Sequence, residues 1–325
     1  MIYPKFISEK NTIGICAPSA GVGRKLDEFK ASNKVLKSLG YKIKETKSVR
    51  VNNPRSASAK KRAKELEELF LDKKVDMVMC AAGGDFMLEM MEYVDLDVIK
   101  NNPKWICGMS DPTNILFPIT TKLDIATFYG TNGAGFTFEK DKSQDVFFEY
   151  IKGNIVKQNS YRKYKSFLDI ITDNDVYHNV KWISKKDQVI TGRLIGGCIE
   201  SIDKLIGTKF DGVNDFIERY KDDGIVWYFD IFDMSSYNFY LTLLQFKNAG
   251  WFKYCKGVLV GRVAFEKVED KKLDYIKAAD KALGKIPHIM EMDIGHTYPG
   301  MTLINGALTK VTYKNNKGSI SFKLK

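Results

Sequence analysis

The run VDMVMCAAGGD at residues 75–85 decides how the first half of this chain folds. Residues 75–81 are almost entirely apolar, and a pair of glycines, Gly83 and Gly84, follows them. A short apolar run bounded by turn residues is typical of a strand that is buried on both faces of a sheet. We therefore predict a buried strand over residues 75–81 that ends at a turn built from the glycine pair.

Strand-like and helical segments alternate on both sides of this run. The strand-like segments are residues 12–17, 41–46, 105–108 and 125–129, and the segments with helical apolar spacing are residues 27–39, 57–71 and 113–122. Strands that alternate with helices across short turns form a parallel sheet with helices on both faces. The sequence thus predicts a fold of the α/β class with a Rossmann-like N-terminal domain.

The second half of the chain has a different pattern. Residues 156–188 are mostly polar, and after them strand-like and helical segments mix before a strand-rich end. We expect the N-terminal α/β domain to span residues 1–155 and a linker or boundary to span residues 156–188. A smaller C-terminal domain, mixed α+β and strand-rich, is expected over residues 189–325.

Composition excludes several classes of protein. The 325 residues are 44% hydrophobic and 28% charged, which provides apolar material for two domain cores and excludes a disordered chain. The net charge of +11 comes from lysines interleaved with acidic residues, so we predict solvated helix faces and no nucleic-acid partner. The chain has no signal-peptide pattern and no long uninterrupted apolar run, so we expect a cytoplasmic protein without a membrane partner.

The five cysteines have no spacing that indicates a disulfide framework or a metal site. They are Cys16, Cys80, Cys107, Cys198 and Cys255. Their number is odd and no C-x-x-C pair occurs, so reduced thiols in the core are the expected state. We predict neither a metal nor an organic cofactor.

Residues 108–112, GMSDP, place Ser110 after a predicted strand and before a predicted helix. In a parallel sheet the carboxyl ends of the strands face the crevice in which ligands bind, and this position exposes a nucleophile. Pro112 stands where the G-x-S-x-G nucleophile turn has its second glycine. Ser or Asp before a proline is also typical of a helix N-cap, so the five residues leave both roles open.

A serine nucleophile needs a base, and the chain has three histidines. His178 lies in a polar segment and His288 follows a proline, so surface and structural roles are expected for these two. His296 lies in the loop DIGHTYPG, where catalytic side chains are commoner than in a core. The base needs a carboxylate to orient it, and Asp230 at the end of the apolar strand WYF is the candidate, with Asp233 as the alternative.

Six motifs occur in a fixed order along nearly the whole chain. They are ICAPSAG (15–21), CAAGGD (80–85), GMSDPT (108–113), GRLIGGCIESIDKLIGT (192–208), WYFDIFD (227–233) with LLQFKNAGWFKYCKGVLVGR (243–262), and DIGHTYPG (293–300). The combined pattern resembles the LD-carboxypeptidase family, which includes the microcin C self-immunity peptidases. The resemblance implies a cytoplasmic serine peptidase with a Ser-Glu-His triad.

Carried over by position, the resemblance implies that Ser110 is the nucleophile and His296 the general base. It also implies an oxyanion hole from the backbone N–H of Gly83 or Gly84 together with that of Asp111. The acid of the family is usually Glu, and the matching position here is Asp230, which is shorter by one methylene.

A second departure from the family lies at the glycine-pair turn. Many members have an arginine before the glycines and Tyr-Gly after them, whereas Ala82 and Asp85-Phe86 stand here. The change affects the expected recognition of the substrate more than the expected chemistry.

The resemblance implies a metal-independent serine carboxypeptidase that hydrolyses an amide next to a terminal carboxylate-bearing residue. The substrate would be a murein tetrapeptide, which loses D-Ala, or an aminoacyl-nucleotide or peptide antibiotic. The run GRLIGGC and the segment around Trp182 favour the second branch. A homodimer is also implied by the resemblance.

Two other classes of function remain open from the residues alone. One is a non-catalytic protein that binds a small anionic ligand at Gly83-Gly84, in which Ser110 and Asp111 are only caps. The other is a basic nucleic-acid binder, whose affinity would fall steeply with added salt.

Overall fold

The computed structural model describes residues 1–139 and 141–325, and the chain forms two compact units. The first unit contains residues 1–155 and 302–305, and the second contains residues 156–301 and 306–325. Residues 156–188, which we expected to be a linker or boundary, belong to the second unit. That unit is therefore about as long as the first, where we expected a smaller domain.

The first unit is built on a six-stranded sheet with the order β13-β5-β4-β3-β1-β2. Its strands are β1 (Thr12–Cys16), β2 (Lys42–Glu45), β3 (Met77–Cys80), β4 (Trp105–Gly108), β5 (Thr127–Tyr129) and β13 (Leu303–Asn305). The first five run parallel, and β13 pairs with β5 antiparallel. Chain order reverses between β1 and β3, and such a switch point is where open α/β sheets bind ligands.

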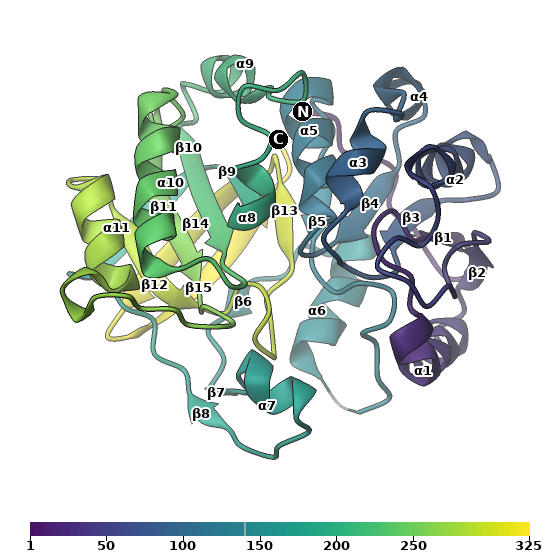
Figure 1. The fold of residues 1–325 in the computed structure, drawn as a ribbon, viewed down its shortest axis with the longest axis horizontal. Helices are drawn as coiled ribbons and strands as arrows, with labels where there is room; N and C mark the ends of the chain where they lie inside the picture. Colours follow the sequence, from purple (N-terminus) through teal and green to yellow (C-terminus); the bar gives the residue numbers. More distant parts are fainter. Residues whose placement is uncertain (140) are drawn as a thin grey trace. The chain divides into compact units, whose positions relative to one another are not determined.

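Helices cover both faces of this sheet. They are α1 (Leu26–Ser38), α2 (Ala59–Leu71), α3 (Met87–Met91), α4 (Leu96–Asn101), α5 (Thr113–Leu123) and α6 (Lys142–Ile151), with the short 3-10 turn η1 (Gly23–Lys25) before α1. Figure 1 shows α1 and α6 on one side of the sheet and α2 to α5 on the other. In α2, the Ser58 side chain caps the N-terminus, and the predicted apolar stripe with Leu66 and Phe70 is buried.

The second unit is built on a seven-stranded mixed sheet with the order β12-β11-β10-β9-β14-β15-β6. Its strands are β6 (Gln158–Asn159), β9 (Gln188–Cys198), β10 (Ile225–Asp230), β11 (Cys255–Gly261), β12 (His288–Met292), β14 (Leu308–Lys314) and β15 (Lys317–Lys323). Strands β9 to β12 run parallel, and β14, β15 and β6 continue the sheet antiparallel. All six residues of β10 are buried, which agrees with its continuous apolar sequence.

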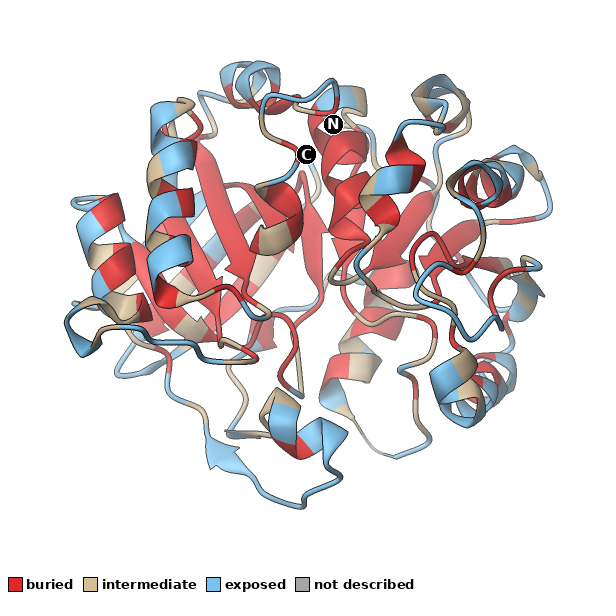
Figure 2. Ribbon diagram, viewed as in Figure 1, coloured by how far each residue is buried: buried red, intermediate tan, exposed pale blue. Residues whose placement is uncertain are grey.

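The remaining elements of the second unit are mostly helices. They are α7 (Phe167–Ile171), α8 (Ile199–Ile202), α9 (Val213–Arg219), α10 (Ser236–Asn248), the 3-10 turn η2 (Lys271–Leu273) and α11 (Tyr275–Leu283), and β7 (Lys163–Tyr164) pairs with β8 (His178–Asn179). Helices α10 and α11 pack side by side (Figure 1). In each unit the central strands, such as β3, β4 and β10, are buried, and the outer faces of the helices are exposed (Figure 2).

The predicted fold class is confirmed, because a largely parallel α/β sheet is followed by a strand-rich mixed sheet. Element ends agree with the sequence expectations to within about two residues in most of the first unit, as is usual for well-capped periodic segments. Among the described residues, no helix is both long and apolar enough to cross a membrane.

Candidate active site

Ser110 occupies a strained turn between β4 and α5 in the first unit. Its backbone φ is +72°, a left-handed conformation that non-glycine residues seldom adopt. Such strain costs about 1–3 kcal/mol and persists where the surrounding structure enforces it, most often at functional sites. In α/β-hydrolases a sharp strand-to-helix turn exposes the hydroxyl of the nucleophilic serine above the sheet. Ser110 is partly exposed.

Side chains from β5 and the loop after it hold this turn in place. The Tyr129 hydroxyl accepts a hydrogen bond from the Ser110 amide at 3.1 Å. The Asn132 side chain accepts from the Met109 amide at 3.0 Å and donates to the Met109 carbonyl at 3.2 Å. Hydrogen bonds from the same unit therefore fix the backbone of Met109 and Ser110. Such contacts allow a strained conformation to persist in the folded protein.

Neither Ser110 nor Asp111 caps the backbone of helix α5. The N-cap position is Pro112, without a side-chain cap, and the helix begins at Thr113. Within the described residues the Ser110 hydroxyl has no hydrogen-bond partner. The side chains of Ser110 and Asp111 thus do not perform the capping role that the sequence left open. The Ser110 hydroxyl remains available for chemistry.

The glycine-pair turn packs directly against the Ser110 side chain. A Cβ added at Gly83 would lie 3.1 Å from Ser110 Cβ and 3.3 Å from its Oγ. Gly84 has φ +145°, and a Cβ there would collide with Ser19 Oγ, so this position requires glycine. In the described part of the chain neither amide N–H of the pair donates a hydrogen bond. The turn that carries these two amides thus contacts the serine through Gly83.

The buried Asp111 carboxylate joins the segments around this turn. One oxygen accepts hydrogen bonds from the Ser19 hydroxyl and, at 2.8 Å, from the Met87 amide at the start of α3. The other accepts from Asn114 Nδ2 at 2.7 Å. The carboxylate therefore links the loop after β1, the start of α3 and the start of α5, which keeps the Ser110 turn and the glycine pair in register.

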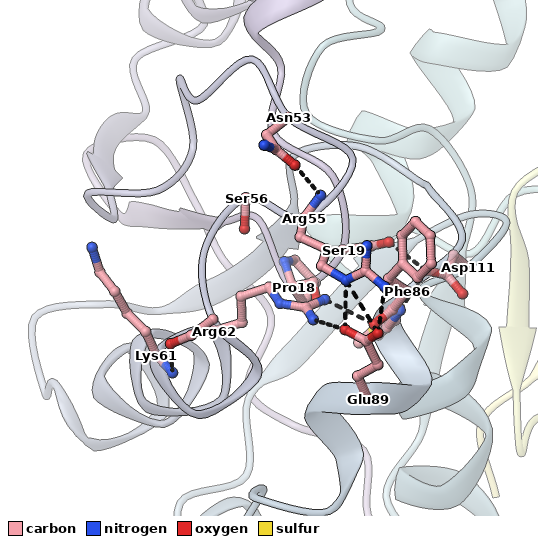
Figure 3. A network of polar contacts seen from close by, with 12 residues as sticks. Pro18, Ser19, Asn53, Arg55, Ser56, Lys61, Arg62, Phe86, Glu89 and Asp111 are labelled. Atoms are coloured by element: carbon pink, nitrogen blue, oxygen red, sulfur yellow. Dashed lines mark hydrogen bonds and ion pairs between the residues drawn. The ribbon is translucent and has the colours of Figure 1, made fainter.

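A cationic cluster lies beside this network (Figure 3). Glu89 on α3 accepts three hydrogen bonds from the Arg55 guanidinium, and it forms an ion pair with Arg62 at 3.1 Å. The Arg62 guanidinium also donates to the carbonyls of Pro18 and Phe86, both at 2.9 Å. Arg62 is almost fully buried, so it fastens the loop after β1 to the end of the glycine-pair turn. The sequence analysis did not single out these arginines.

Asp230 and His296 form a buried pair in the second unit. His296 Nδ1 lies 3.1 Å from Asp230 Oδ1 and 2.9 Å from Oδ2. Asp230 ends β10 and has no exposed surface, while His296 is 8% exposed. An imidazole held at Nδ1 by a carboxylate presents Nε2 for proton transfer, which is the arrangement of a general base with its orienting acid.

Gly295 explains how the short aspartate reaches the histidine. Its φ is +91°, and a Cβ at this position would lie 1.8 Å from Asp230 Oδ1. The backbone of the DIGHTYPG loop can therefore approach the end of β10 only because the residue before His296 has no side chain. The missing methylene of Asp230 is compensated by this close approach.

The pKa of His296 is raised above the usual histidine value. Burial by itself lowers it, but the charge of Asp230, the hydrogen bond to it and the charge of Glu200 together outweigh burial. The ring packs against two aromatic side chains, with centroids 4.7 Å from Phe232 and 5.8 Å from Phe167. The protonated ring is thus favoured by two carboxylates in an otherwise apolar setting.

A second buried ion pair holds the start of the histidine loop. Arg262 Nη2 donates to Asp293 Oδ1, and Trp182 Nε1 donates to Asp293 Oδ2 at 2.8 Å. Arg262 Nε lies 3.3 Å from the Thr297 hydroxyl, directly after His296. Arg262 and Asp293 are both buried, so they fix the loop from both sides of the histidine. The sequence did not indicate this pair, although Arg262 is the last residue of the motif LLQFKNAGWFKYCKGVLVGR.

The other candidates from the sequence lie elsewhere. Asp233 is half exposed, and its carboxylate pairs with Lys267 at 2.9 Å. His178 is partly exposed and bonds Asp169, while His288 is buried and bonds Asp280 at 2.8 Å. His296 is therefore the histidine that the structure pairs with the predicted acid, and Asp230 rather than Asp233 is its partner.

The candidate residues fall into two groups, one in each unit. Ser110, Gly83, Gly84 and Asp111 lie together in the first unit. Asp230 and His296 lie together in the second, where the sequence reasoning overlooked Glu200. Among the described residues, no group of three or more His, Cys, Asp or Glu side chains is arranged to hold a metal ion.

Comparison with known proteins gives matches to both units. Residues 13–130 match the LD-carboxypeptidase N-terminal domain, and residues 191–311 match the LD-carboxypeptidase C-terminal domain. A Treponema pallidum protein named "Putative carboxypeptidase" is 30% identical over 270 residues, which cover 79% of this chain and 75% of that protein.

Two solved structures share the fold. Microcin C7 self immunity protein MccF in complex with aspartyl sulfamoyl adenosine has a TM-score of 0.82 and 22% identity, with 99% of each chain covered. Muramoyltetrapeptide carboxypeptidase from Oxalobacter formigenes has a TM-score of 0.76 and 18% identity, with 97% of this chain and 99% of that chain covered.

Proposed function

This chain belongs to the LD-carboxypeptidase family, and from this premise we propose that it is a serine carboxypeptidase. In the proposal it hydrolyses, without a metal ion, an amide next to a terminal carboxylate-bearing residue. The observation that carries the proposal is the buried hydrogen bond between His296 Nδ1 and Asp230. A buried aspartate that orients a histidine in this way is a costly arrangement that serves proton transfer.

We assign the three steps of acyl transfer to three side chains. Ser110 Oγ attacks the carbonyl carbon while His296 Nε2 takes the hydroxyl proton, which gives a tetrahedral intermediate. His296 then donates that proton to the leaving amine, and the acyl group stays on Ser110. Water, deprotonated by His296, attacks the ester and releases the acid, while Asp230 holds the ring and stabilises its protonated form.

We assign the oxyanion hole to backbone amides around the serine. The candidate donors are the N–H of Gly83 or Gly84, whose turn contacts the Ser110 side chain at Gly83, and the N–H of Asp111, which follows Ser110 in the sequence. Donors fixed before the reaction begins stabilise the developing charge without reorganisation, and the loss of one typically costs about 100- to 1000-fold in rate. The Asp111 carboxylate network supports this role because it holds these segments in place.

The names of two solved structures of similar fold support two candidate substrate classes. A relative of similar fold binds aspartyl sulfamoyl adenosine, and another is named for muramoyltetrapeptide. Trp182, whose segment favoured the aminoacyl-nucleotide or peptide-antibiotic branch, is fully buried and bonded to Asp293, so its indole is not a surface on which a base stacks. This removes one argument for a nucleotide substrate, and we propose a peptide with a terminal carboxylate as the first compound to test.

Product analysis by mass spectrometry tests the proposal. The purified protein and its Ser110→Ala variant are each incubated with a murein tetrapeptide and, separately, with an aminoacyl-sulfamoyl adenosine. We expect loss of D-Ala from the tetrapeptide with the wild type and a decrease in kcat of about 10³-fold or more with Ser110→Ala. Cleavage of the adenosine compound alone would assign the other substrate class. If neither compound is cut, or if both proteins cut equally, the proposal is wrong.

A further inference from the structure

The carboxylate of Glu200 accepts hydrogen bonds from three consecutive backbone amides. Its Oε1 accepts hydrogen bonds from Phe232 at 2.8 Å and from Asp233 and Met234, both at 2.9 Å. These residues belong to the loop 231–235, which follows β10 and leads to α10. One oxygen that accepts three N–H groups fixes the path of that loop, because the charge strengthens each hydrogen bond.

The loop that Glu200 holds is in contact with the histidine. The Phe232 ring packs against the His296 imidazole with a centroid distance of 4.7 Å, and Phe167 packs against both rings. The hydrogen bond from the Phe232 amide to Glu200 therefore sets the position of one wall of the imidazole pocket. Asp230, which orients the ring, is the last residue of the strand that precedes this loop.

The negative charges of Glu200 and Asp230 both act on the Cys198 thiol. Cys198 pairs with Asp230 in the register between β9 and β10, and its Sγ donates to Glu200 Oε2 at 3.1 Å. Burial raises the pKa of the Cys198 thiol most, and the charges of Glu200 and Asp230 raise it further. The charges of both carboxylates thus act on Cys198, with Asp230 at the end of β10 and Glu200 on α8.

The charged groups that face His296 come from three elements. Asp230 lies at the end of β10, and Glu200 lies on α8. Arg262, directly after β11, bonds Thr297, the residue after His296, but is neutralised by Asp293. The aromatic walls carry no charge, so the two carboxylates decide how readily the ring accepts a proton.

We propose that Glu200 is a positioning residue for His296: it holds Phe232 against the imidazole, and its negative charge stabilises the protonated ring during proton transfer. The catalytic meaning of this inference rests on the proposed function, in which His296 is the general base. Glu200 touches neither the substrate nor the reacting atoms in this scheme. Glu200 acts through the position of loop 231–235 and through the electrostatic field of its negative charge.

The charge and the shape of Glu200 can be separated by two variants. Glu200→Gln keeps an oxygen acceptor for the three amides but removes the charge. Glu200→Ala removes both, so it frees the loop as well. Glu269→Gln is the matched control, because Glu269 also accepts a backbone amide in this unit, that of Tyr237 in the first turn of α10. Glu269 is exposed and lies in the segment between β11 and η2.

NMR titration of the histidines tests the inference without any turnover. Protein labelled at histidine is titrated from about pH 5 to about pH 9, and the His296 signal is identified from its loss in His296→Gln. We expect Glu200→Gln to lower the pKa of His296 by about half a unit or more, because a nearby opposite charge is lost. His178 and His288 serve as internal references that stay unchanged. In Glu269→Gln the pKa of His296 should equal that of the wild type.

Equal His296 pKa values in Glu200→Gln and in the wild type would overturn the inference. If Glu200→Ala does not fold, Glu200→Gln alone decides, since it retains the amide acceptor. The same variants are then assayed for the pH dependence of kcat/KM, whose acidic limb should move to lower pH in Glu200→Gln. A wild type that titrates as expected but cuts no substrate would contradict the proposed function while leaving the electrostatic role of Glu200 intact.

Discussion

The two halves of the candidate site are held in place by different means. In the first unit, Ser110 is positioned by its backbone: φ is +72°, the amide is fixed by Tyr129, and glycine occupies the adjacent turn. In the second unit, His296 is positioned by its side chain, through the Asp230 carboxylate and aromatic walls. A backbone-held group depends on sterics, and a side-chain-held group depends on charge.

This difference has consequences for how each half responds to change. A nucleophile needs its oxygen at one point, which a rigid strained turn provides before the substrate arrives. A base must exist in two protonation states, so its neighbours have to stabilise the charged form but still allow it to release its proton. Substitutions that remove charge should therefore damage the His296 half most, and substitutions that change backbone freedom should have their clearest effect at Ser110 and Gly295.

The largest effect after loss of the nucleophile is expected at the acid. Asp230→Asn retains the size of the side chain but removes the charge that stabilises the imidazolium, and it favours the wrong tautomer of His296. We expect kcat to fall about 10⁴-fold, as when the orienting aspartate of a serine triad is lost. Steady-state kinetics on the cleaved substrate measures this change, with circular dichroism to verify folding.

Asp233→Asn provides the matched comparison for that variant. It removes the same charge three residues later, where the carboxylate is half exposed and faces Lys267. Exposed ion pairs contribute little, so kcat and stability should stay close to those of the wild type. If Asp233→Asn were the more damaging of the two, Asp233 and not Asp230 would be the acid.

An intermediate effect is expected from a methyl group at Gly295. Gly295→Ala places a Cβ 1.8 Å from Asp230 Oδ1 in the observed geometry and also has to adopt φ +91°. The backbone or the carboxylate must move, so we expect a loss of about 2–4 kcal/mol in the free energy of unfolding and a large decrease in kcat. Chemical denaturation and the same kinetic assay measure the two effects.

Gly207→Ala is the control for Gly295→Ala, because it has the backbone strain of a positive φ without a steric collision. Gly207 has φ +71°, but a Cβ there would meet no atom within 4 Å. This variant should lose only about 1 kcal/mol from its left-handed backbone and keep full activity. Equal losses of stability in the two variants would show that the close approach of Gly295 to Asp230 is not what positions the histidine.

The sequence predicted the elements of the first unit well because each has strong local signals. The run 75–81 became β3, and the spacing of 113–122 became α5, each bounded by turn residues that end the element. The family indicated by the motifs is also confirmed. Ser110 is recognisable as a strand-end residue, but its left-handed φ is not, because Pro112 makes the same five residues resemble a cap.

What the sequence could not provide is the set of contacts between distant segments. Glu200 and loop 231–235 are joined by hydrogen bonds across about thirty residues, and Arg262 meets Asp293 from another strand end. No local periodicity encodes such pairs. The segment 156–188 was misleading for a related reason: β6 pairs with β15, and Lys165 and Ile183 form bridges to Tyr298 and Met290, all of them distant in the sequence.

The smallest expected effect tests the strain at the nucleophile. Ser110→Gly and Ser110→Ala both abolish turnover, but only glycine adopts φ +72° without a steric cost. We expect Ser110→Gly to be more stable than Ser110→Ala by about 1 kcal/mol, which denaturant titration of the two inactive proteins resolves. The comparison is free of catalytic effects, because neither protein turns over. Equal stabilities would mean that the turn costs the folded protein nothing, and the Ser110 half would then be no more backbone-strained than the His296 half.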